Sequence, residues 1–431
     1  MANSFKFRWT ELSLLILPAV FLTLGMAALT LSRSDLLNSS QVLAAAGVLS
    51  MFMIAHLVLM WRLPNADQLL LPIVAMLTLL GLVMSARLSV LVPGLMTRQS
   101  MWISVGLLLL IAVVVLIPDV SVFQSYKYTA AVLGFLVVAA TFVLGIDTND
   151  SGARWWIGFG GYNFQPSEIL KVLLVIFLAG YLEDKRELLT WSSTRFGWLR
   201  LPPLPYLGPL AVMWGVSMIL LIGQKDLGAA LLFYSIFLAM LYVASSRGAY
   251  VWGGLVAFAV GAFVCYLAFA HVRLRVEVWL NPWIHARDEA YQVVQGLVAL
   301  ASGGIIGRGL GYGYPGFVPA IQTDFIIAAI GEELGLMGTL AVVALFLLLM
   351  YRGFRIAMDT QRGFSVLLAM GLTAVLGIQA IVILAGTIKL TPLTGITLPF
   401  VSYGGSSIVT NFIIVGLLLR VSAEGHERHA K

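Results

Sequence analysis

Long apolar stretches recur from one end of the chain to the other, and they restrict the possible folds more than any other feature. We count about twelve runs long enough to cross about 30 Å of hydrocarbon, and they are centred near residues 22, 51, 79, 109, 136, 174, 215, 236, 260, 338, 376 and 413. With 60% hydrophobic and 11% charged residues, the composition excludes a soluble globule. The sequence therefore predicts an all-α polytopic membrane protein with one membrane domain.

The rest of the composition narrows the class of protein. The single Cys265 lies inside an apolar run, which excludes an intramolecular disulfide and argues against a thiol-metal cluster. The first apolar stretch, from Leu14 to Leu31, is longer than a signal-peptide core and lacks a small-residue cleavage site, so we expect it to stay as an anchor. The formal charge of +6 fits membrane orientation better than nucleic-acid binding.

Charge asymmetry predicts the orientation. An even number of spans places both termini on one side, and with loops assigned alternately that side carries more Lys and Arg, so both termini are expected in the cytoplasm. The outer connection 271–323 is about fifty residues long, a length that usually carries function. Its segment 290–300 has helical spacing, which indicates either an interfacial helix at the outer leaflet or a re-entrant packing segment.

An acidic cluster lies at the head of the tenth apolar run, in T-D-F-I-I-A-A-I-G-E-E-L-G. A charged side chain near the middle of a membrane helix costs roughly 2.5–3.5 kcal/mol and usually faces a bundle interior or a water-filled cavity. Asp324, Glu332 and Glu333 must therefore be compensated. Asp324 is the first functional candidate, and the alternative is that Thr323 and Asp324 cap a helix.

A second candidate segment, residues 152–171, leads from an outer loop into the sixth run. Pro166 suits the first turn of a helix, and Glu168 and Lys171 follow it three residues apart. They form either a self-satisfied ion pair or part of a site. Arg154, just outside the bilayer, suits phosphate binding because a guanidinium binds phosphate in a bidentate manner.

Two further segments carry cations. Lys225 lies in the tight outer turn Q-K-D-L-G, where solvated turn charges are the simpler interpretation. The glycine-rich run 303–313 resembles a nucleotide loop, but no strand precedes it and it lies on the outer side, so that match is rejected. We expect it to be backbone that wraps a bulky ligand, with Arg308 as an additional cation.

The last outer loop, residues 389–407, contains helix-breaking proline and glycine and leads into the final span. Ser402, Ser406 and Ser407 offer hydroxyls near a helix N-terminus, where free amides attract anions. A nucleophilic role for Ser402 is unattractive, because the outer-side histidines belong to a distant loop. The alternative is an ordinary capped re-entrant turn.

Together the outer side offers one acid, scattered cations and hydroxyl-rich helix breaks, which fits an anionic lipid headgroup. A base that deprotonates a sugar hydroxyl beside cations that hold a departing pyrophosphate needs these residue types. Asp324 is the catalytic candidate. The candidate substrate-binding residues are Arg154, Glu168, Lys171, Lys225, Arg275, Arg308, Thr323, Lys389, Ser402, Ser406 and Ser407.

In combination, these motifs resemble the SEDS family, the RodA and FtsW peptidoglycan glycosyltransferases. G-A-R-W-W-I, F-Q-P-S-E-I-L-K, Q-K-D-L-G, Y-Q-V-V-Q-G-L-V-A, G-R-G-L-G, T-D-F-I with E-E-L-G, and L-P-F-V-S-Y-G-G-S-S occur in the family's order. The resemblance covers roughly residues 68–422, a body of about ten spans. Residues 1–67 are then two additional N-terminal helices and 423–431 a cytoplasmic tail. The stretch 387–395 is closer to RodA than to FtsW.

The resemblance implies polymerisation of lipid II into glycan strands outside the bacterial cytoplasmic membrane, for elongation or division. The 4-hydroxyl of one disaccharide would attack the anomeric carbon of another, with inversion and loss of undecaprenyl pyrophosphate. The family's essential aspartate falls on Asp324, and its conserved cavity positions fall on Glu168, Lys171, Arg154 and the 402–407 turn. The family also implies a divalent cation, Mg²⁺ or Mn²⁺, with no dedicated ligand set legible in this chain. It further implies a class B penicillin-binding protein as partner.

Departures from the family's pattern lie beside the catalytic position. Many relatives have P-E-A-H-T-D, whereas this chain runs Pro319, Ala320, Ile321, Gln322, Thr323, Asp324. The missing acid and histidine weaken any proton relay or metal ligand proposed there. Lys225 replaces a common proline. The competing hypotheses are a lipid II flippase or another anion transporter, for which two similar halves would be expected, and a noncatalytic scaffold.

Overall fold

The computed structural model describes most of the chain, and every structural statement below concerns that part. The described residues are 7–32, 38–146, 155–159, 162–186, 194–196, 199–201, 215 and 226–429. They divide into two compact units, each treated by itself.

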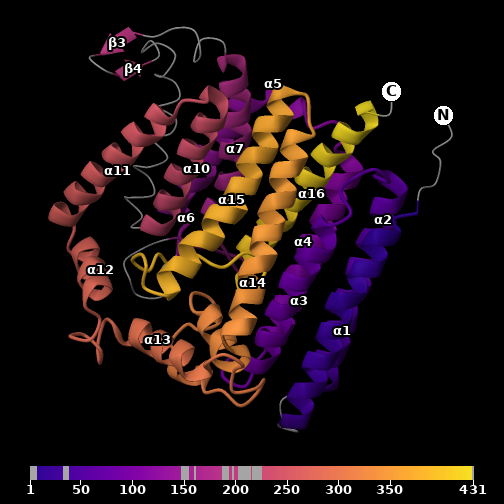
Figure 1. Ribbon diagram of the computed structural model, residues 1–431, viewed down its shortest axis with the longest axis vertical. Helices are drawn as coiled ribbons and strands as arrows, with labels where there is room; N and C mark the ends of the chain where they lie inside the picture. Colours follow the sequence, from indigo (N-terminus) through magenta and orange to yellow (C-terminus); the bar gives the residue numbers. More distant parts are fainter. Residues whose placement is uncertain are drawn as a thin grey trace. The chain divides into compact units, whose positions relative to one another are not determined.

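Unit 1 comprises Met1–Pro118, Phe269–Arg352 and Gln379–Lys431. It contains α1 (Trp9–Ser32), α2 (Ser39–Arg62), α3 (Leu70–Leu88), α4 (Leu95–Leu116), α12 (Ala270–Leu280), α13 (Tyr291–Gly303), the short 3-10 helix η1 (Pro315–Phe317), most of α14 (Ile326–Met358), the end of α15 (Gly363–Thr387) and α16 (Gly405–His429). Within it α16 packs along α4, α1 along α3 and α2 along α4. The two chain ends of this unit lie at one end of it and α13 at the other (Figure 1).

Unit 2 comprises Asp119–Ala268 and Gly353–Ile378. It contains α5 (Val122–Ser125), α6 (Lys127–Leu144), α7 (Pro166–Asp184), α10 (Leu227–Ser245) and α11 (Gly248–Ala268), and α7 packs against both α6 and α10. Two antiparallel hairpins, β1 (Ile157–Phe159) with β2 (Tyr162–Phe164) and β3 (Thr194–Phe196) with β4 (Leu199–Leu201), join its helices. These hairpins are not predicted by the sequence analysis.

The predicted membrane architecture is confirmed. Every predicted span centre except the one near residue 215 falls inside a helix of at least 18 residues, and residue 215 stands in a stretch otherwise outside the described residues. Among the described residues, ten helices are long and apolar enough to cross a membrane. The helix α7 is not among them because it carries too many charges, although it covers the predicted sixth span. The fold is a helical multi-pass membrane protein.

The helix predicted within 290–300 is α13, and it packs against protein. A Cβ on Gly296 would overlap the ring of Phe325, and one on Gly303 would overlap the backbone of Gly331. The buried positions of α13 therefore face the start of α14, as the packing interpretation of this segment expects. Its depth in the membrane stays a prediction.

The long helix α14 is broken at Gly335, and the glycine-rich run closes the break. Gly335 has φ 71° and ψ −168°, a conformation open to glycine because it has no side chain. The amide of Leu336 donates to the carbonyl of Gly304, and the amide of Gly309 donates to the carbonyl of Glu333. Backbone groups freed by the break thus find partners in the 303–309 loop, as buried backbone requires. The loop therefore has a structural role in the fold, and its predicted role in wrapping a ligand stays a prediction.

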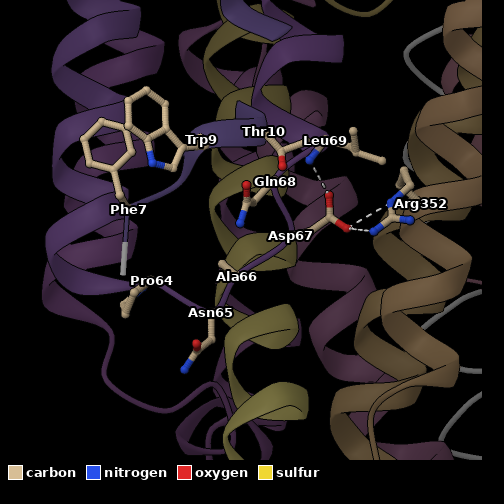
Figure 2. A pocket seen from close by; sticks show the side chains of 10 residues that line it. All are labelled: Phe7, Trp9, Thr10, Pro64, Asn65, Ala66, Asp67, Gln68, Leu69 and Arg352. Carbon is tan, nitrogen blue, oxygen red and sulfur yellow. Dashed lines mark hydrogen bonds and ion pairs between the residues drawn. The ribbon is translucent and has the colours of Figure 1, made fainter. Parts of the chain in front are cut away.

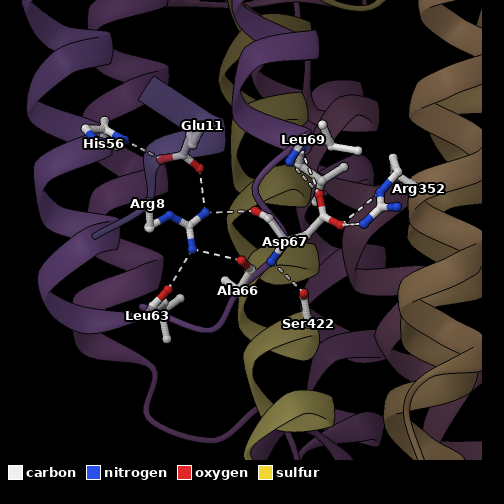
Figure 3. Close-up of polar contacts among 10 residues, drawn as sticks. Arg8, Glu11, His56, Leu63, Ala66, Asp67, Leu69, Arg352 and Ser422 are labelled. Atoms are coloured by element: carbon white, nitrogen blue, oxygen red, sulfur yellow. Dashed lines mark hydrogen bonds and ion pairs between the residues drawn. The ribbon is translucent and has the colours of Figure 1, made fainter. Parts of the chain in front are cut away.

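A buried ionic network ties the N-terminal helix to the turn between α2 and α3 (Figure 3). The fully buried Arg8 pairs with Glu11 at 2.5 Å and donates to the carbonyls of Leu63, Ala66 and Asp67 at 2.8 Å. His56 contacts the second oxygen of Glu11 at 2.6 Å. The first two helices are therefore joined to the turn that enters α3, and unit 1 includes them.

We predict that Glu11→Gln lowers the melting temperature of the detergent-solubilised protein strongly. The substitution leaves the buried Arg8 without its counter-charge, and breaking a buried pair costs about 3–5 kcal/mol. The control is Asp359→Asn, which removes the partner of Arg355 in an exposed pair worth about 0–1 kcal/mol. Equal shifts in the two variants would contradict a stabilising role for the Arg8 network.

Candidate functional site

Asp324 lies in a tight turn just before α14 begins. Ala320 opens the turn with φ 48°, which is uncommon for a residue with a side chain. Its carbonyl accepts the amides of Thr323 at 3.1 Å and Asp324 at 3.2 Å, and also the Thr323 hydroxyl at 3.0 Å. The turn places the Asp324 carboxylate at the edge of a pocket.

That pocket has a volume of about 240 Å³ and belongs entirely to unit 1. Its walls come from α12, the start of α13, the Asp324 turn and the segment that follows α15. The charged and polar residues that line it are Arg275, Glu289, Gln292, Asp324, Lys389 and Thr391, with Trp279 and Gly395 among the others. Two acids, Asp324 and Glu289, therefore share a small cavity with two cations, Arg275 and Lys389.

Contacts between α12 and the 389–395 segment hold the two cations at this cavity. The indole of Trp279 donates to the carbonyl of Lys389 at 3.2 Å, and the guanidinium of Arg275 donates to the carbonyl of Leu393 at 3.4 Å. The ammonium of Lys389 donates to the carbonyl of Leu280 at 3.3 Å. Lys389 itself has φ 62°, a left-handed backbone conformation that reverses the chain at the start of the 389–395 segment.

The environment of Asp324 favours a carboxyl that changes charge near neutral pH. Burial raises the pKa of Asp324 from 3.8 to about 6, while a hydrogen bond from Thr323 and the charge of Arg275 oppose that rise. Gly395, with φ 72°, lies beside this carboxylate, since a Cβ built on it would stand 3.8 Å from an Asp324 oxygen, an ordinary van der Waals distance. A carboxyl with such a pKa in a cavity is a candidate general base.

The capping alternative for Asp324 finds no support in the part of the chain described here. No hydrogen bond joins the Asp324 carboxylate to an amide of the first turn of α14 in that part, whereas Asp226 accepts the amide of Ala229 at 3.0 Å as a true cap of α10. The Asp324 side chain faces the cavity instead.

The predicted serines do not line the Asp324 pocket, and Ser402 is the one that contacts the Asp324 turn. Ser402 is buried, and its hydroxyl donates to the Thr323 carbonyl at 2.6 Å. Ser406 and Ser407 are buried in the first turn of α16, where the Ser407 hydroxyl lies 3.4 Å from the amide nitrogen of Gln379. Arg308 is held by its own loop, with its side chain over the ring of Tyr314. These residues do not line the Asp324 cavity.

The candidates of the 152–171 segment belong to unit 2. Lys171 is buried and pairs with Glu168 at 2.5 Å on α7, which starts at Pro166 as predicted. Asp226, which the sequence analysis does not nominate, accepts a hydrogen bond from Gln165 at 3.4 Å. Arg154 and Lys225 lie outside the described residues, so their predicted roles stay predictions.

The acids Glu332 and Glu333 are compensated inside the protein. Arg87 from α3 pairs with Glu333 at 2.8 Å, and the second Glu333 oxygen accepts the amide of Gly311 at 3.0 Å. Glu332 accepts the amide of Tyr314 at 2.9 Å. The sequence analysis predicts that these acids have partners and misses Arg87, because nothing local in the sequence links α3 to α14.

A larger pocket, about 650 Å³ in volume, lies at the end of unit 1 that carries the chain termini (Figure 2). Its one acid, Asp67, is already satisfied. One Asp67 oxygen accepts the amides of Leu69 and Leu70, and the other pairs with Arg352 at 2.9 Å from its Nε. Because no free acid or base faces this pocket among the described residues, we assign the chemistry to the Asp324 cavity.

Comparison with known proteins decides the family. The model of the family of FtsW, RodA and SpoVE, described as cell cycle proteins, matches residues 67–427. The chain belongs to this family. The match begins where α2 has ended, so the first two helices of this FtsW/RodA/SpoVE member lie outside the family region.

Individual relatives agree with this assignment. Peptidoglycan glycosyltransferase RodA of Mycobacterium tuberculosis is 40% identical over 382 residues, which cover 87% of this chain and 81% of the relative. A solved chain from a study of the structural coordination of polymerization and crosslinking by a peptidoglycan synthase complex matches with TM-score 0.68 and 27% identity, over 84% of this chain and 99% of that one. The crystal structure of Thermus thermophilus rod shape determining protein RodA matches with TM-score 0.57 and 26% identity, over 83% and 96%.

Proposed function

We propose that this protein is a peptidoglycan glycosyltransferase that polymerises lipid II at the outer face of the bacterial cytoplasmic membrane. The observation that carries the proposal is the Asp324 cavity, where one acid with a raised pKa stands with Arg275 and Lys389. Relatives that share the family carry the name peptidoglycan glycosyltransferase RodA. The cavity supplies the base and the cations that such a transfer requires.

In the proposed reaction Asp324 takes the proton from the 4-hydroxyl of the acceptor disaccharide. The resulting oxygen attacks the anomeric carbon of the donor, and the bond from that carbon to the undecaprenyl pyrophosphate oxygen breaks with inversion. A base with a pKa near 6 suits the task, because a general base works best when its pKa lies near the operating pH. Arg275 and Lys389 would stabilise the negative charge that develops on the pyrophosphate.

We propose that the other predicted substrate residues contact parts of the substrate outside the Asp324 cavity. Glu168 and Lys171 form an ion pair on α7, and we propose that this pair separates when a lipid-linked sugar binds. Ser406, Ser407 and Arg308 do not line the Asp324 cavity, so they are proposed to act further along the substrate. Arg154 and Lys225 lie outside the described residues, and we propose for them the substrate-binding roles that the sequence predicts.

We also propose that both termini are cytoplasmic. Arg8 near the N-terminus donates to carbonyls of the 63–67 turn, and the amide of Asp67 in that turn donates to the Ser422 hydroxyl near the C-terminus at 2.8 Å. Both ends of the chain therefore meet at one end of unit 1. The helix α13 lies towards its other end (Figure 1) and contributes Gln292 and Val293 to the wall of the Asp324 cavity, so that end would then face outward.

A class B penicillin-binding protein is the proposed partner, because a structural relative comes from work on a peptidoglycan synthase complex. We also propose that a divalent cation screens the pyrophosphate, as the family resemblance implies. The described residues contain no group of three His, Cys, Asp or Glu side chains able to hold one, so this cation would be bound mainly by the substrate. The polymer yield from lipid II with and without the transpeptidase tests the partner. The yield with and without a chelator tests the cation.

Purified Asp324→Asn is predicted to lose polymer formation from lipid II by at least about 100-fold, because amide nitrogen cannot accept the acceptor proton. The measurement is the length and amount of glycan formed in reconstituted membranes. Asp288→Asn, an exposed acid of the same outer segment that does not line the cavity, should retain activity. Headgroup translocation without polymer in the wild type would instead favour a flippase, and unaffected growth of an Asp324→Asn strain would favour a scaffold.

The pH dependence of kcat/KM should rise through pH about 6, since Asp324 accepts a proton only in its ionised form and its pKa is about 6. Arg275 lowers that pKa, so Arg275→Gln is expected to move the acid limb to higher pH. Arg287→Gln removes an exposed cation of the same segment and should leave the limb in place. An acid limb that stays fixed in Arg275→Gln would disprove the electrostatic coupling.

A further inference from the structure

We propose that Ser402 is a positioning residue that fixes the turn carrying Asp324, and that it does not bind substrate through its hydroxyl. This inference rests on the proposed function, because it concerns how the base of that reaction is held. Ser402 lies in the segment before α16, whereas Asp324 precedes α14. Ser402 contacts the Thr323 carbonyl, which is 79 residues away in the sequence.

The Ser402 hydroxyl is already committed to the backbone on both sides. It donates to the carbonyl of Thr323 at 2.6 Å and accepts the amide of Leu398 at 3.0 Å. A serine hydroxyl has one proton to donate, and here that proton serves the peptide group directly before Asp324. With 1% of its surface exposed, Ser402 cannot donate to a phosphate without releasing the turn.

We call the hydrogen bonds of Ser402 to Thr323 and Leu398 the brace, and residues 398–403 the serine turn. Further hydrogen bonds hold the backbone on either side of these two. The amide of Tyr403 donates to the carbonyl of Gln322 at 2.8 Å, so two consecutive carbonyls before Asp324 are held by two consecutive residues of the serine turn. From the other side, the side chain of Gln292 on α13 donates to the carbonyl of Pro319 at 2.9 Å. Bonds from two separate elements therefore set the path of the backbone that presents the carboxylate.

The serine turn is itself held rigidly in the core of unit 1. Phe400 is fully buried with φ 65°, a backbone state that persists only where surrounding packing enforces it. A Cβ on Gly81 of α3 would overlap the backbone of Val401, so the turn lies directly against that helix. The amide of Gln99 on α4 lies 3.3 Å from the Ser402 carbonyl. The brace thus connects Asp324 to the packed helices α3 and α4.

The consequence for catalysis follows from geometry. A catalytic group must be held within about 0.5 Å of its productive position, and a misplacement of 1 Å can cost about 100-fold in rate. Removal of the Ser402 hydroxyl leaves the Thr323 carbonyl and the Leu398 amide unpaired, and the Asp324 turn is then free to relax. A relaxed turn would also carry Asp324 away from Arg275, whose charge lowers the pKa of Asp324, so that pKa would rise.

The test compares Ser402→Ala, Ser402→Cys and the control Ser85→Ala in steady-state polymerisation of lipid II by the full-length protein in reconstituted membranes. Ser85 is also buried, but its hydroxyl donates within its own helix, to the Gly81 carbonyl at 2.8 Å. We expect Ser402→Ala to lower kcat by about 10-fold to 100-fold, with KM for lipid II within about twofold and the acid limb moved to higher pH. Cysteine is a weak donor of similar size, so Ser402→Cys should lower kcat less, in the same direction. If the alanine variant fails to fold, the kcat and acid limb of Ser402→Cys test the inference.

Three results would overturn the inference. A raised KM with unchanged kcat in Ser402→Ala would show that the hydroxyl binds substrate, as the sequence-based interpretation of this serine expects. A lower kcat with an unmoved acid limb, matched by Ser85→Ala, would show loss of folded protein only. Full activity in both Ser402 variants would show that the brace is dispensable. Absence of polymer from the wild type would instead count against the proposed function itself.

Discussion

The compensation of buried charge governs this structure. In a chain this apolar, each ionised group kept from water needs a partner, because an unpaired buried charge is costly. Arg8 with Glu11, Arg87 with Glu333 and Lys171 with Glu168 meet that requirement at 2.5–2.8 Å. Asp324 is the exception. Among the described residues no ion pair joins its carboxylate to a cation, and Arg275 acts on it only through its charge across the cavity. A place in a cavity without a direct ion pair is therefore what distinguishes the base from the structural carboxylates.

The break in α14 explains how a long membrane helix can carry both kinds of acid. Glu332 and Glu333 end its first segment, and Gly335 turns the chain so that the 303–309 loop can bind the freed backbone groups. The first segment is then packed by α13 and joined to α3 through Arg87. Asp324 consequently enters the cavity from a short, fixed segment, and the longer second segment is anchored separately through Arg352, which pairs with Asp67.

The sequence predicts the parts of this arrangement that depend on local composition. Hydropathy locates the spans because each must cover the same hydrocarbon thickness, and the cost of a charge in an apolar run singles out Asp324. Partners distant in sequence are a different matter. Arg87 and Glu333 are 246 residues apart and Ser402 lies 79 residues from Thr323, so only tertiary packing brings them together. The hairpins β1–β2 and β3–β4 also escape prediction, because three-residue strands leave no periodicity to detect.

Separate contacts hold the base and the cations of the cavity. Side-chain hydrogen bonds from Gln292 on α13 and from Ser402 fix the backbone before Asp324. The contact of α12 with the 389–395 segment places Arg275 and Lys389. A movement of α12 would therefore shift the cations while the base stays in place. Because the charge of Arg275 lowers the pKa of Asp324, such a movement would change the strength of the base without displacing the turn that carries it.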